Sequence, residues 1–508
     1  MAGGYERGAR SLSAVGRVAL TPVIEDAAHF PSTAGCKVQD VSFDKRVYAP
    51  IGHGDQNREN LIMGALGARS TAFRTDQYEV GNLQGALHSG VASRRAVFEV
   101  FARRLPPGRR YGVFCGLGRV LDGLSRFRFT EAQVRWLAET GVADRRTRHQ
   151  LEGQRFCGDI WAYREGEIYF PHSPVITVRA TFGEAVLLET ILLSICNWDS
   201  GIASSAARMV TAARGRPIIE MGTRRTHEDA AIDAARAAYI AGFGATSNME
   251  AGFRYGIPVR GTAAHCFTLA HPDELAAFKA QVATQGPGTT LLVDTYDVEQ
   301  GIRNAVAAAG PGLGGIRIDS GELLRLVPFA RELLDQLGAT KTRIILTGGL
   351  DEYAMDELSL GPVDGFGAGE KLIHHPSPGF VYKLVAIAES DEPAAPMRPV
   401  AKTAIGKTNI GGQKWAYREY DAQGLAIAEH LVIGDAPPRT APPGEPLQTQ
   451  VVATGETVQA QSIEEARAYH ARTKARLPPH QLSIQAGPPA MVARRWSSRV
   501  KNVEVARP

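Results

Sequence analysis

The stretch Thr290-Leu-Leu-Val-Asp294 decides the fold class, because it is a short apolar run that ends on a carboxylate and the same pattern recurs. The run Gly315-Ile-Arg-Ile318 is followed by Asp319 in the same way. Further short apolar runs occupy residues 217–219, 257–259, 343–346 and 363–366. Spacings of about 19–40 residues leave room for one helix between successive strands, which is typical of repeated βαβ units. The sequence therefore predicts a parallel sheet between about residues 217 and 388.

Helices are predicted between these strands from their capping residues. Thr226-His-Glu-Asp229 fits a capping box, and an alanine-rich run as far as Ala241 follows it. Pro328 suits the first turn of a later helix, and Gly338 suits the position just after its last turn.

The segment before the predicted sheet mixes the two kinds of element. Residues 96–101 alternate as a strand does, residues 168–170 and 174–178 are predicted to be two more strands, and residues 131–139 are predicted to be a helix. Strands that do not alternate regularly with helices indicate an α+β unit.

The two ends of the chain carry weaker patterns. Residues 1–70 show no clean period and are expected to be a loosely ordered extension. Five prolines between residues 437 and 446 mark a stiff exposed loop, a helix is predicted over 463–476, and a frayed basic tail is expected from 487. The predicted division is an extension (1–70), an N-terminal α+β domain (71–200), an α/β-barrel domain (201–392), a C-terminal region packing on both (393–486) and a basic tail (487–508).

The composition excludes several classes of protein. Lysine and arginine total 57 against 53 acidic residues, a net charge of +4, which argues against a nucleic-acid-wrapping protein. The five cysteines form no C-x-x-C pair, which argues against a structural zinc site and favours reduced thiols in the cytoplasm. The most apolar stretch, 185–198, is interrupted by Glu189 and is too short to span a bilayer. We therefore expect a cytoplasmic globular protein without a membrane segment.

Polar residues follow the predicted strands, and ligands bind at the carboxyl ends of parallel strands. The groups that follow the six runs are Glu220-Met-Gly-Thr-Arg-Arg225, Arg260-Gly-Thr-Ala-Ala-His265, Asp294-Thr-Tyr-Asp297, Asp319-Ser-Gly321, Thr347-Gly-Gly349 and Gly367-Ala-Gly369. Glycine turns let backbone N–H groups close on a phosphate, and arginines pair with anionic oxygens. Carboxylates beside a phosphate hold Mg²⁺ or accept sugar hydroxyls. Together these groups indicate a phosphorylated sugar substrate with an acidic partner.

Each of these groups also has a simpler explanation. Asp319 suits a helix N-cap, and Gly348 with Gly349 suits a tight turn. His265 suits a hydrogen-bonded core histidine, and Arg224 with its neighbour suits an exposed pair at a helix start. A shared site is favoured because all of these groups fall at the same end of successive strands.

The motifs, taken together and in order, closely resemble those of the nicotinate phosphoribosyltransferases, nearest to the bacterial, actinobacterial type, from about residue 73 to about residue 482. The matching stretches are Thr75-Asp-Gln-Tyr78, Phe98-Glu-Val-Phe-Ala-Arg-Arg-Leu105, Glu220-Met-Gly-Thr-Arg-Arg225, Gly261-Thr-Ala-Ala-His265, Leu292-Val-Asp-Thr-Tyr-Asp297, Arg317-Ile-Asp-Ser-Gly321, Thr347-Gly-Gly-Leu-Asp351, Phe366-Gly-Ala-Gly369 and Val381-Tyr-Lys-Leu-Val385. The stretches 292–297 and 317–321 are the most distinctive.

The resemblance implies an irregular (β/α) barrel, an N-terminal α+β domain, a C-terminal extension and a homodimer with shared active sites. It implies the first step of NAD salvage, in which nicotinate and 5-phosphoribosyl 1-diphosphate yield nicotinate mononucleotide and diphosphate. It also implies Mg²⁺, and ATP hydrolysis coupled through a phosphohistidine.

The resemblance assigns roles residue by residue. His265 matches the phosphorylated histidine, and Asp294 and Asp319 match the carboxylates that face the ribose and Mg²⁺. The residues matched to nicotinate contacts are Tyr78, from the partner subunit in related enzymes, Arg224, Thr262 and Arg317. The residues matched to the 5-phosphate cradle are Gly348, Gly349, Gly367 and Gly369.

Two positions bear on substrate choice and activity. The related nicotinamide enzyme has an aspartate where this chain has Ser247, so nothing there repels a nicotinate anion, which favours nicotinate over nicotinamide or another pyridine. The family usually has threonine where this chain has Glu370, and a carboxylate facing a phosphate would repel it. Either Glu370 points away and Lys371 compensates, or phosphate binding is weakened. A catalytically degenerate barrel that acts as a binding protein is therefore a further alternative.

Overall fold

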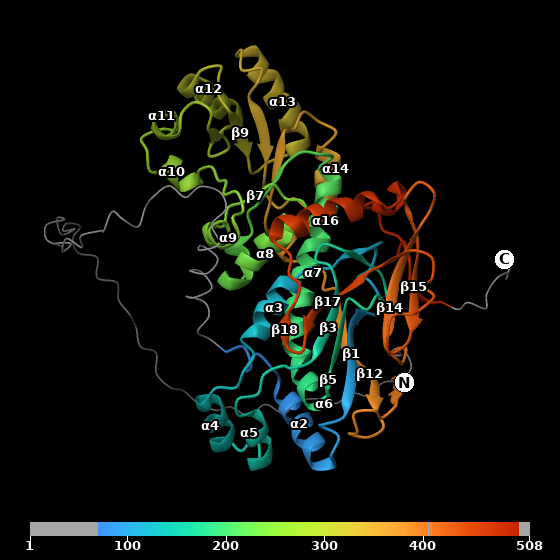
Figure 1. Cartoon of the computed structure of the whole chain (residues 1–508). Helices are drawn as coiled ribbons and strands as arrows, with labels where there is room; N and C mark the ends of the chain where they lie inside the picture. Colours follow the sequence, from blue (N-terminus) through green and yellow to red (C-terminus); the bar gives the residue numbers. More distant parts are fainter. Residues whose placement is uncertain (1–69, 405–406, 408, 497–508) are drawn as a thin grey trace, which may run out of the picture. The chain divides into compact units, whose positions relative to one another are not determined.

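The parallel sheet lies in the second half of the chain. The computed structural model describes residues 70–404, 407 and 409–496, so the predicted extension 1–70 falls almost wholly outside the described residues (Figure 1). Six parallel strands pair in the order β7-β6-β11-β10-β9-β8. Their bounds are β6 Ile218–Glu220, β7 Ala245–Thr246, β8 Thr290–Leu292, β9 Gly315–Ile318, β10 Arg343–Leu346 and β11 Gly365–Ala368. Within the described residues no ladder joins β7 to β8, so the sheet is a curled half-barrel.

One of the six predicted strands is wrong. Residues 257–259 form no strand, and Val259 makes only an isolated bridge to Thr246. Pro258 has no N–H group to donate to a ladder, which explains why this run cannot continue the sheet. The strand beside β6 is instead β7, which is too short and too polar in its surroundings to stand out in the sequence.

Helices follow the strands of this sheet, as the spacing predicted. Their bounds are α8 Glu228–Ile240, α9 Met249–Tyr255, α10 His265–Leu269, α11 Glu274–Gln285, α12 Val298–Ala309, α13 Leu323–Gln336, α14 Glu352–Leu358 and α15 Glu370–Ile373. The predicted capping box at Thr226 is wrong, because α8 is capped by His227, whose imidazole accepts from the N–H of Asp229. Pro328 lies inside α13 rather than in its first turn, because the helix begins earlier, where Leu323 packs against the core.

The second large sheet of the described chain has seven strands, and all of its neighbouring strands are antiparallel. Its strand order is β13-β12-β1-β5-β3-β17-β18. The bounds are β1 Arg95–Ala102, β3 Asp159–Tyr163, β5 Ile176–Thr181, β12 Phe380–Ala388, β13 Met397–Pro399, β17 Gln448–Ala453 and β18 Glu456–Thr457. The predicted strands over 96–101 and 174–178 and the predicted helix 131–139 (α4 Glu131–Glu139) are confirmed. The predicted strand over 168–170 is β4 Ile168–Tyr169, which pairs with β2 Gly112–Val113.

The remaining helices of the first half surround this sheet. They are α2 Gln77–Ser89, α3 Leu117–Ser125, α5 Arg145–Leu151, α6 Phe182–Ala185 and the long helix α7 Glu189–Ala212. Helix α7 runs across residue 200, and β12 joins the antiparallel sheet although it follows the parallel one in sequence. The domain division proposed from the sequence therefore stays a prediction.

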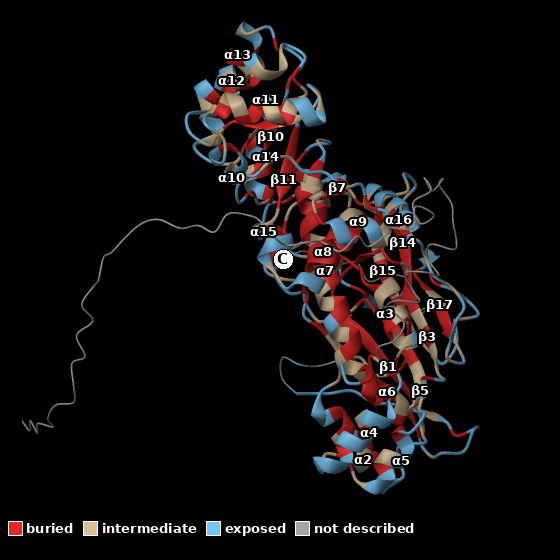
Figure 2. Cartoon of the chain, turned by 90° about the vertical axis from the view of Figure 1, so that its left-hand side faces the viewer, coloured by how far each residue is buried: buried red, intermediate tan, exposed pale blue. Residues whose placement is uncertain are grey.

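Helix α7 joins the two hydrophobic cores. Ile191 and Ile195 in its first half pack in the core of the antiparallel sheet, and Ile202 and Met209 in its second half pack in the core of the parallel sheet. The helical run 182–212 is long and apolar enough to pass a compositional test for a membrane span, but 67% of its most apolar window is buried inside the fold. Figure 2 shows α7 as a largely buried element. Burial in two cores therefore accounts for its apolar composition.

The C-terminal residues add a small sheet and a helix to the fold. A small sheet has the order β16-β14-β15-β19, with bounds β14 Lys414–Tyr420, β15 Ala426–Ile433, β16 Glu445–Pro446 and β19 Arg494–Arg495. The predicted helix over 463–476 is α16 Ile463–Ala475, capped by Ser462. The expectation of a frayed tail from 487 is wrong for residues 487–496, because Met491 is buried and β19 pairs with β15.

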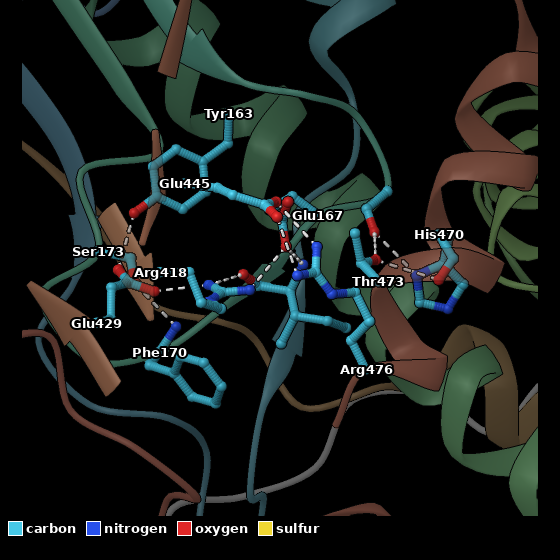
Figure 3. Close-up of polar contacts among 12 residues, drawn as sticks. Tyr163, Glu167, Phe170, Ser173, Arg418, Glu429, Glu445, His470, Thr473 and Arg476 are labelled. Carbon is cyan, nitrogen blue, oxygen red and sulfur yellow. Dashed lines mark hydrogen bonds and ion pairs between the residues drawn. The ribbon is translucent and has the colours of Figure 1, made fainter. Parts of the chain in front are cut away.

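Buried charges tie this C-terminal sheet to the first half of the chain (Figure 3). The guanidinium of Arg418 on β14 is 2% exposed and donates to Glu167 at 2.7 Å and to Glu429 at 2.6 Å. The carboxylate of Glu429 also accepts from the Tyr163 hydroxyl at 2.8 Å and from Ser173 at 2.5 Å. Two buried carboxylates therefore depend on one buried arginine for their counter-charge.

Replacing Arg418 by methionine should strongly destabilise the fold. The substitution leaves Glu167 and Glu429 buried without their partner, and breaking a buried ion pair in this way costs about 3–5 kcal/mol. Urea unfolding followed by circular dichroism measures the loss. The control is Arg303→Ala, which removes an exposed pair with Glu299 at 2.8 Å on α12 and should cost less than about 1 kcal/mol. Equal unfolding midpoints for the two variants would contradict the assigned role of Arg418.

Candidate active site

Arg317 connects two strand ends and the loop of Thr262 at the carboxyl-terminal edge of the parallel sheet. Its guanidinium donates from Nη2 to Asp319 at 2.8 Å, from Nε to the Thr347 hydroxyl at 2.9 Å and from Nη1 to the Thr262 hydroxyl at 2.8 Å. The side chain comes from β9, where its neighbours Ile316 and Ile318 point into the core. Side chains alternate between the two faces of a strand, so Arg317 points to the opposite face. There its planar guanidinium holds the residues at the carboxyl-terminal edge of the sheet, which we call the rim.

Asp319 lies directly after β9 and is held as a carboxylate. It accepts from Arg317 and from the Thr347 hydroxyl. Partial burial alone would raise its pKa, but the hydrogen bonds from Thr347 and Arg317 outweigh that effect, so the pKa of Asp319 lies below its ordinary value. The simpler expectation that Asp319 caps the next helix is wrong, because the N-cap of α13 is Glu322.

Asp294 lies beside Asp319, one strand away. Its Oδ2 accepts from the backbone N–H of Asp319 at 3.0 Å and from the Ser320 hydroxyl at 2.6 Å. The side chain is 1% exposed, and its Oδ1 has no hydrogen-bond partner among the described residues. A buried carboxylate oxygen without a donor is ready to accept a proton, a cation or a substrate hydroxyl.

His265 faces this free carboxylate oxygen. Its Nε2 lies 4.0 Å from Oδ1 of Asp294, and its Nδ1 lies 3.4 Å from the hydroxyl of Thr295. The imidazole is 40% exposed at the first residue of α10. The simpler expectation of a buried core histidine is therefore wrong. The imidazole ring is accessible from solvent, and the buried carboxylate of Asp294 lies on its inner side.

The predicted glycines lie in one turn, after β10, and at the end of one strand, β11, at the same edge. Gly348 and Gly349 have φ values of 98° and 70°, so both adopt the left-handed conformation of a tight turn. A Cβ on Gly348 would collide with the carbonyl oxygen of Asp319. A Cβ on Gly367 would lie 2.5 Å from Thr347, and one on Gly369 would lie 2.7 Å from the carbonyl oxygen of Met221. Gly348 and Gly369 therefore pack against backbone carbonyl groups and Gly367 packs against side chains, so none of the three positions has room for a larger residue.

Two further predicted residues lie on the neighbouring loops. Arg224 is exposed on the short 3-10 helix Thr223–Arg225 that follows β6, and it has no hydrogen bond or ion pair within the described residues. Ser247 follows β7, and its backbone N–H donates to the carbonyl of Glu220 at 2.8 Å. The sheet therefore brings the loops of Arg224 and Ser247 to one edge through the pairing of β6 with β7.

Tyr78 lies apart from this site within the chain. It is on α2, at the lower end of the molecule in Figures 1 and 2, whereas α10 with His265 lies in the upper half of both views. Tyr78 as a whole residue is 45% exposed. Burial of part of the ring, together with the nearby carboxylate of Glu189, raises the pKa of Tyr78 to about 12. Tyr78 therefore stays protonated at neutral pH and presents an open aromatic face.

Two hydroxyl side chains contribute to the site without having been singled out from the sequence. Thr347 bridges Arg317 and Asp319, and Ser320 donates to Asp294. Each directly follows or adjoins the end of a strand. A search of every strand end for hydroxyl side chains, and not only for charges and glycines, would have found both.

The candidate site offers few side chains that could bind a metal ion. Within residues 70–404, 407 and 409–496, no group of three or more histidine, cysteine, aspartate or glutamate side chains is arranged to hold a metal ion. The paired carboxylates of Asp294 and Asp319, one with a free buried oxygen, still fit a Mg²⁺ ion whose other ligands are water and substrate oxygens.

A parallel α/β sheet that gathers an arginine, two carboxylates, a histidine and glycine turns at one edge defines an enzyme for an anionic, phosphorylated substrate. Residues 73–197 match the family model described as the nicotinate phosphoribosyltransferase N-terminal domain. The chain is 50% identical over 431 residues to nicotinate phosphoribosyltransferase pncB1 of Mycobacterium tuberculosis, covering 83% of this chain and 94% of that relative. The chain belongs to the nicotinate phosphoribosyltransferase family.

More distant relatives support the same assignment. Nicotinate phosphoribosyltransferase of Bacillus subtilis is 38% identical over 361 residues, covering 69% of this chain and 73% of that relative. The crystal structure of human nicotinic acid phosphoribosyltransferase superimposes with a TM-score of 0.71 at 26% identity, covering 83% of this chain and 97% of that one. The predicted family is therefore confirmed, and so is the mixed α/β fold.

Proposed function

We propose that this enzyme transfers the phosphoribosyl group of 5-phosphoribosyl 1-diphosphate to nicotinate, giving nicotinate mononucleotide and diphosphate in NAD salvage. The observation that carries the proposal is the fork of Arg317, which joins Thr262, Thr347 and Asp319 beside Asp294 and His265. These groups bind an anionic ring, a phosphorylated sugar and a leaving diphosphate at a single edge of the sheet.

The nicotinate end of the site is proposed to be set by Arg317. Its planar guanidinium pairs with a carboxylate, and Thr262 adds a hydroxyl at 2.8 Å from Nη1. Ser247 places no negative charge near the ring, and Arg224 adds an unpaired positive charge on the adjoining loop. The unpaired charge of Arg224 favours nicotinate over nicotinamide, because the neutral amide gains nothing from a nearby positive charge.

The sugar end is proposed to lie over Asp294 and Asp319. The pyridine nitrogen attacks C1 of the ribose as diphosphate leaves, so positive charge develops on the sugar in the transition state. Fixed carboxylates nearby stabilise that charge, and the glycine turns at Gly348, Gly349, Gly367 and Gly369 cradle the 5-phosphate through backbone N–H groups. When bound, Mg²⁺ would neutralise the leaving diphosphate, and Asp294 and Asp319 would hold it.

His265 is proposed to accept a phosphoryl group from ATP. The accessible imidazole stands against Asp294, and a carboxylate behind an imidazole favours the tautomer with a free nucleophilic nitrogen. A phosphorylated ring adds negative charge and hydrogen-bond acceptors at the rim, which would order the loop of residues 260–264 that carries Thr262. That ordering would couple ATP hydrolysis to tighter binding of the sugar diphosphate.

A homodimer with shared sites is proposed to supply Tyr78. Within one chain its ring lies away from Arg317 and Thr262, yet it is exposed and held by Glu189 on α7. A second copy that packs α2 against the rim would stack this ring on the pyridine. The proposed location of the dimer is the cytoplasm, where the substrates of NAD salvage are found.

The proposal is tested by a product assay with nicotinate, 5-phosphoribosyl 1-diphosphate and Mg²⁺, with and without ATP. Nicotinate mononucleotide should form, and ATP should increase the rate of its formation. Nicotinamide in parallel reactions should react at least about tenfold more slowly, because a neutral amide does not pair with an arginine. Absence of product under every condition would reject the function, and preference for the amide would reject the Ser247 argument alone.

Substituting His265 by alanine should uncouple ATP from turnover. The variant should lose stimulation by ATP, and its apparent KM for the sugar diphosphate should rise roughly tenfold because a charge-ordered loop is lost. The matched control is His271→Ala, an exposed histidine six residues further on, just after α10, whose Nδ1 lies 2.7 Å from the Phe267 carbonyl. Retained ATP stimulation in His265→Ala would remove the histidine from its proposed role.

Mixed dimers test whether Tyr78 serves the neighbouring subunit. The variants Tyr78→Ala and Asp319→Ala should each be inactive alone, whereas a randomised mixture should recover about a quarter of the native activity, since half of the dimers contain one intact site. Activity is measured after co-refolding, with mixed dimers confirmed by two affinity tags. Confirmed mixed dimers without activity would contradict the shared site.

A further inference from the structure

The loops after β6 and β11 are locked together at the phosphate side of the rim. The two strands are parallel neighbours, and the N–H of Met221 donates to the carbonyl of Ala368 at 2.7 Å beyond the last paired residues. A Cβ on Gly369 would lie 2.7 Å from the Met221 carbonyl, and a Cβ on Gly222 would lie 2.5 Å from Ile373 of α15. The hydrogen bond joins the two loops, and both close contacts need glycine, so the loops pack directly against each other.

An ion pair crosses these two locked loops. Nη1 of Arg225 lies 3.4 Å from Oε2 of Glu370, and the two side chains are 46% and 44% exposed. Glu370 is the first residue of α15, directly after Gly369, and it stands where the resemblance places a threonine. The sequence left open whether a basic residue compensates Glu370 or phosphate binding is weakened. The structure supports compensation, and the basic residue is Arg225 rather than Lys371.

From this geometry we infer that Arg225 is the built-in counter-ion of Glu370, and that the pair determines how tightly this enzyme binds the phosphate of its sugar diphosphate. The inference rests on the proposed function, since it assigns the glycine segment 367–369, at the end of β11, to that phosphate. Arg225 neutralises a carboxylate that adjoins the turn, so the anion is not repelled. Glu370 in turn keeps Arg225 from acting as a phosphate ligand, which leaves Arg224 as the unpaired arginine of this loop.

The electrostatic consequences have definite signs. Removing Arg225 alone leaves an uncompensated carboxylate directly after Gly369. One unit of charge roughly 10 Å from an anion near a protein surface changes affinity on the order of tenfold. Removing Glu370 alone frees a positive charge and tightens binding. Removing both side chains leaves no net charge at the two positions. The KM of the double variant should therefore lie close to that of the native enzyme.

The experiment is a double-mutant cycle read as the KM for 5-phosphoribosyl 1-diphosphate. Arg225→Ala should raise this KM by about tenfold, Glu370→Gln should lower it by about threefold, and the double variant should return to within about twofold of the native enzyme. The KM for nicotinate should stay within about twofold throughout, which a general loss of structure would not allow. The effect of Arg225→Ala should also shrink in 0.5 M salt, because salt screens exposed charges.

A matched control uses an exposed pair remote from the rim. Arg303→Ala, Glu299→Gln and their double variant remove a pair with 45% and 49% exposed side chains on α12, and all three should keep the native KM. A double variant as impaired as Arg225→Ala would overturn the inference and make Arg225 a direct phosphate ligand. An unchanged KM in Arg225→Ala would overturn it too. A native enzyme that makes no nicotinate mononucleotide would instead reject the proposed function, and calorimetric binding of the sugar diphosphate to the same four proteins would still decide the inference.

Discussion

The parallel pairing of β8, β9 and β10 is the constraint on which the candidate site depends. Each strand contributes a residue at or just beyond its carboxyl end. The register brings Arg317 and Thr347 into hydrogen-bonding distance of the Asp319 carboxylate, and it brings Asp294 to the backbone N–H of Asp319. None of these contacts is local in sequence beyond the pair 317 and 319. A shift of one strand by a single residue would turn Arg317 into the core and leave Asp319 without its guanidinium.

The rim also depends on support from outside the parallel sheet. Helix α7 belongs to both hydrophobic cores, so the sheet that carries the site cannot loosen without disturbing the antiparallel sheet. Arg109 and Arg208 both donate to Glu352 at 2.9 Å, at the start of the helix that follows Gly348 and Gly349. Charged residues from the N-terminal half therefore hold the glycine turn of the barrel half in place.

Glu370, which stands where the family usually has threonine, shows that the effect of a residue depends on its neighbours in the fold. In sequence, a carboxylate after a glycine turn suggests weakened phosphate binding. In the fold, the parallel pairing of β6 with β11 places Arg225 opposite it, and Gly222 and Gly369 let the two loops pack closely enough for an ion pair. The function of a rim residue is thus set as much by the neighbouring strand as by its own motif.

Much of this protein followed from the sequence by itself. Short apolar runs with helix-length spacing predicted five of the six parallel strands, and the motifs at their ends identified the family and grouped His265, Asp294, Arg317 and Asp319 at one edge. Local pattern suffices there, because strand period and capping act over a few residues. Tertiary structure alone decided that β7 replaces residues 257–259 as a strand, that Thr347 and Ser320 join the site, that Tyr78 stands apart, and that Arg225 compensates Glu370. Those outcomes depend on which strands become neighbours and on backbone groups that meet across long separations, and no local pattern of residues encodes such pairings.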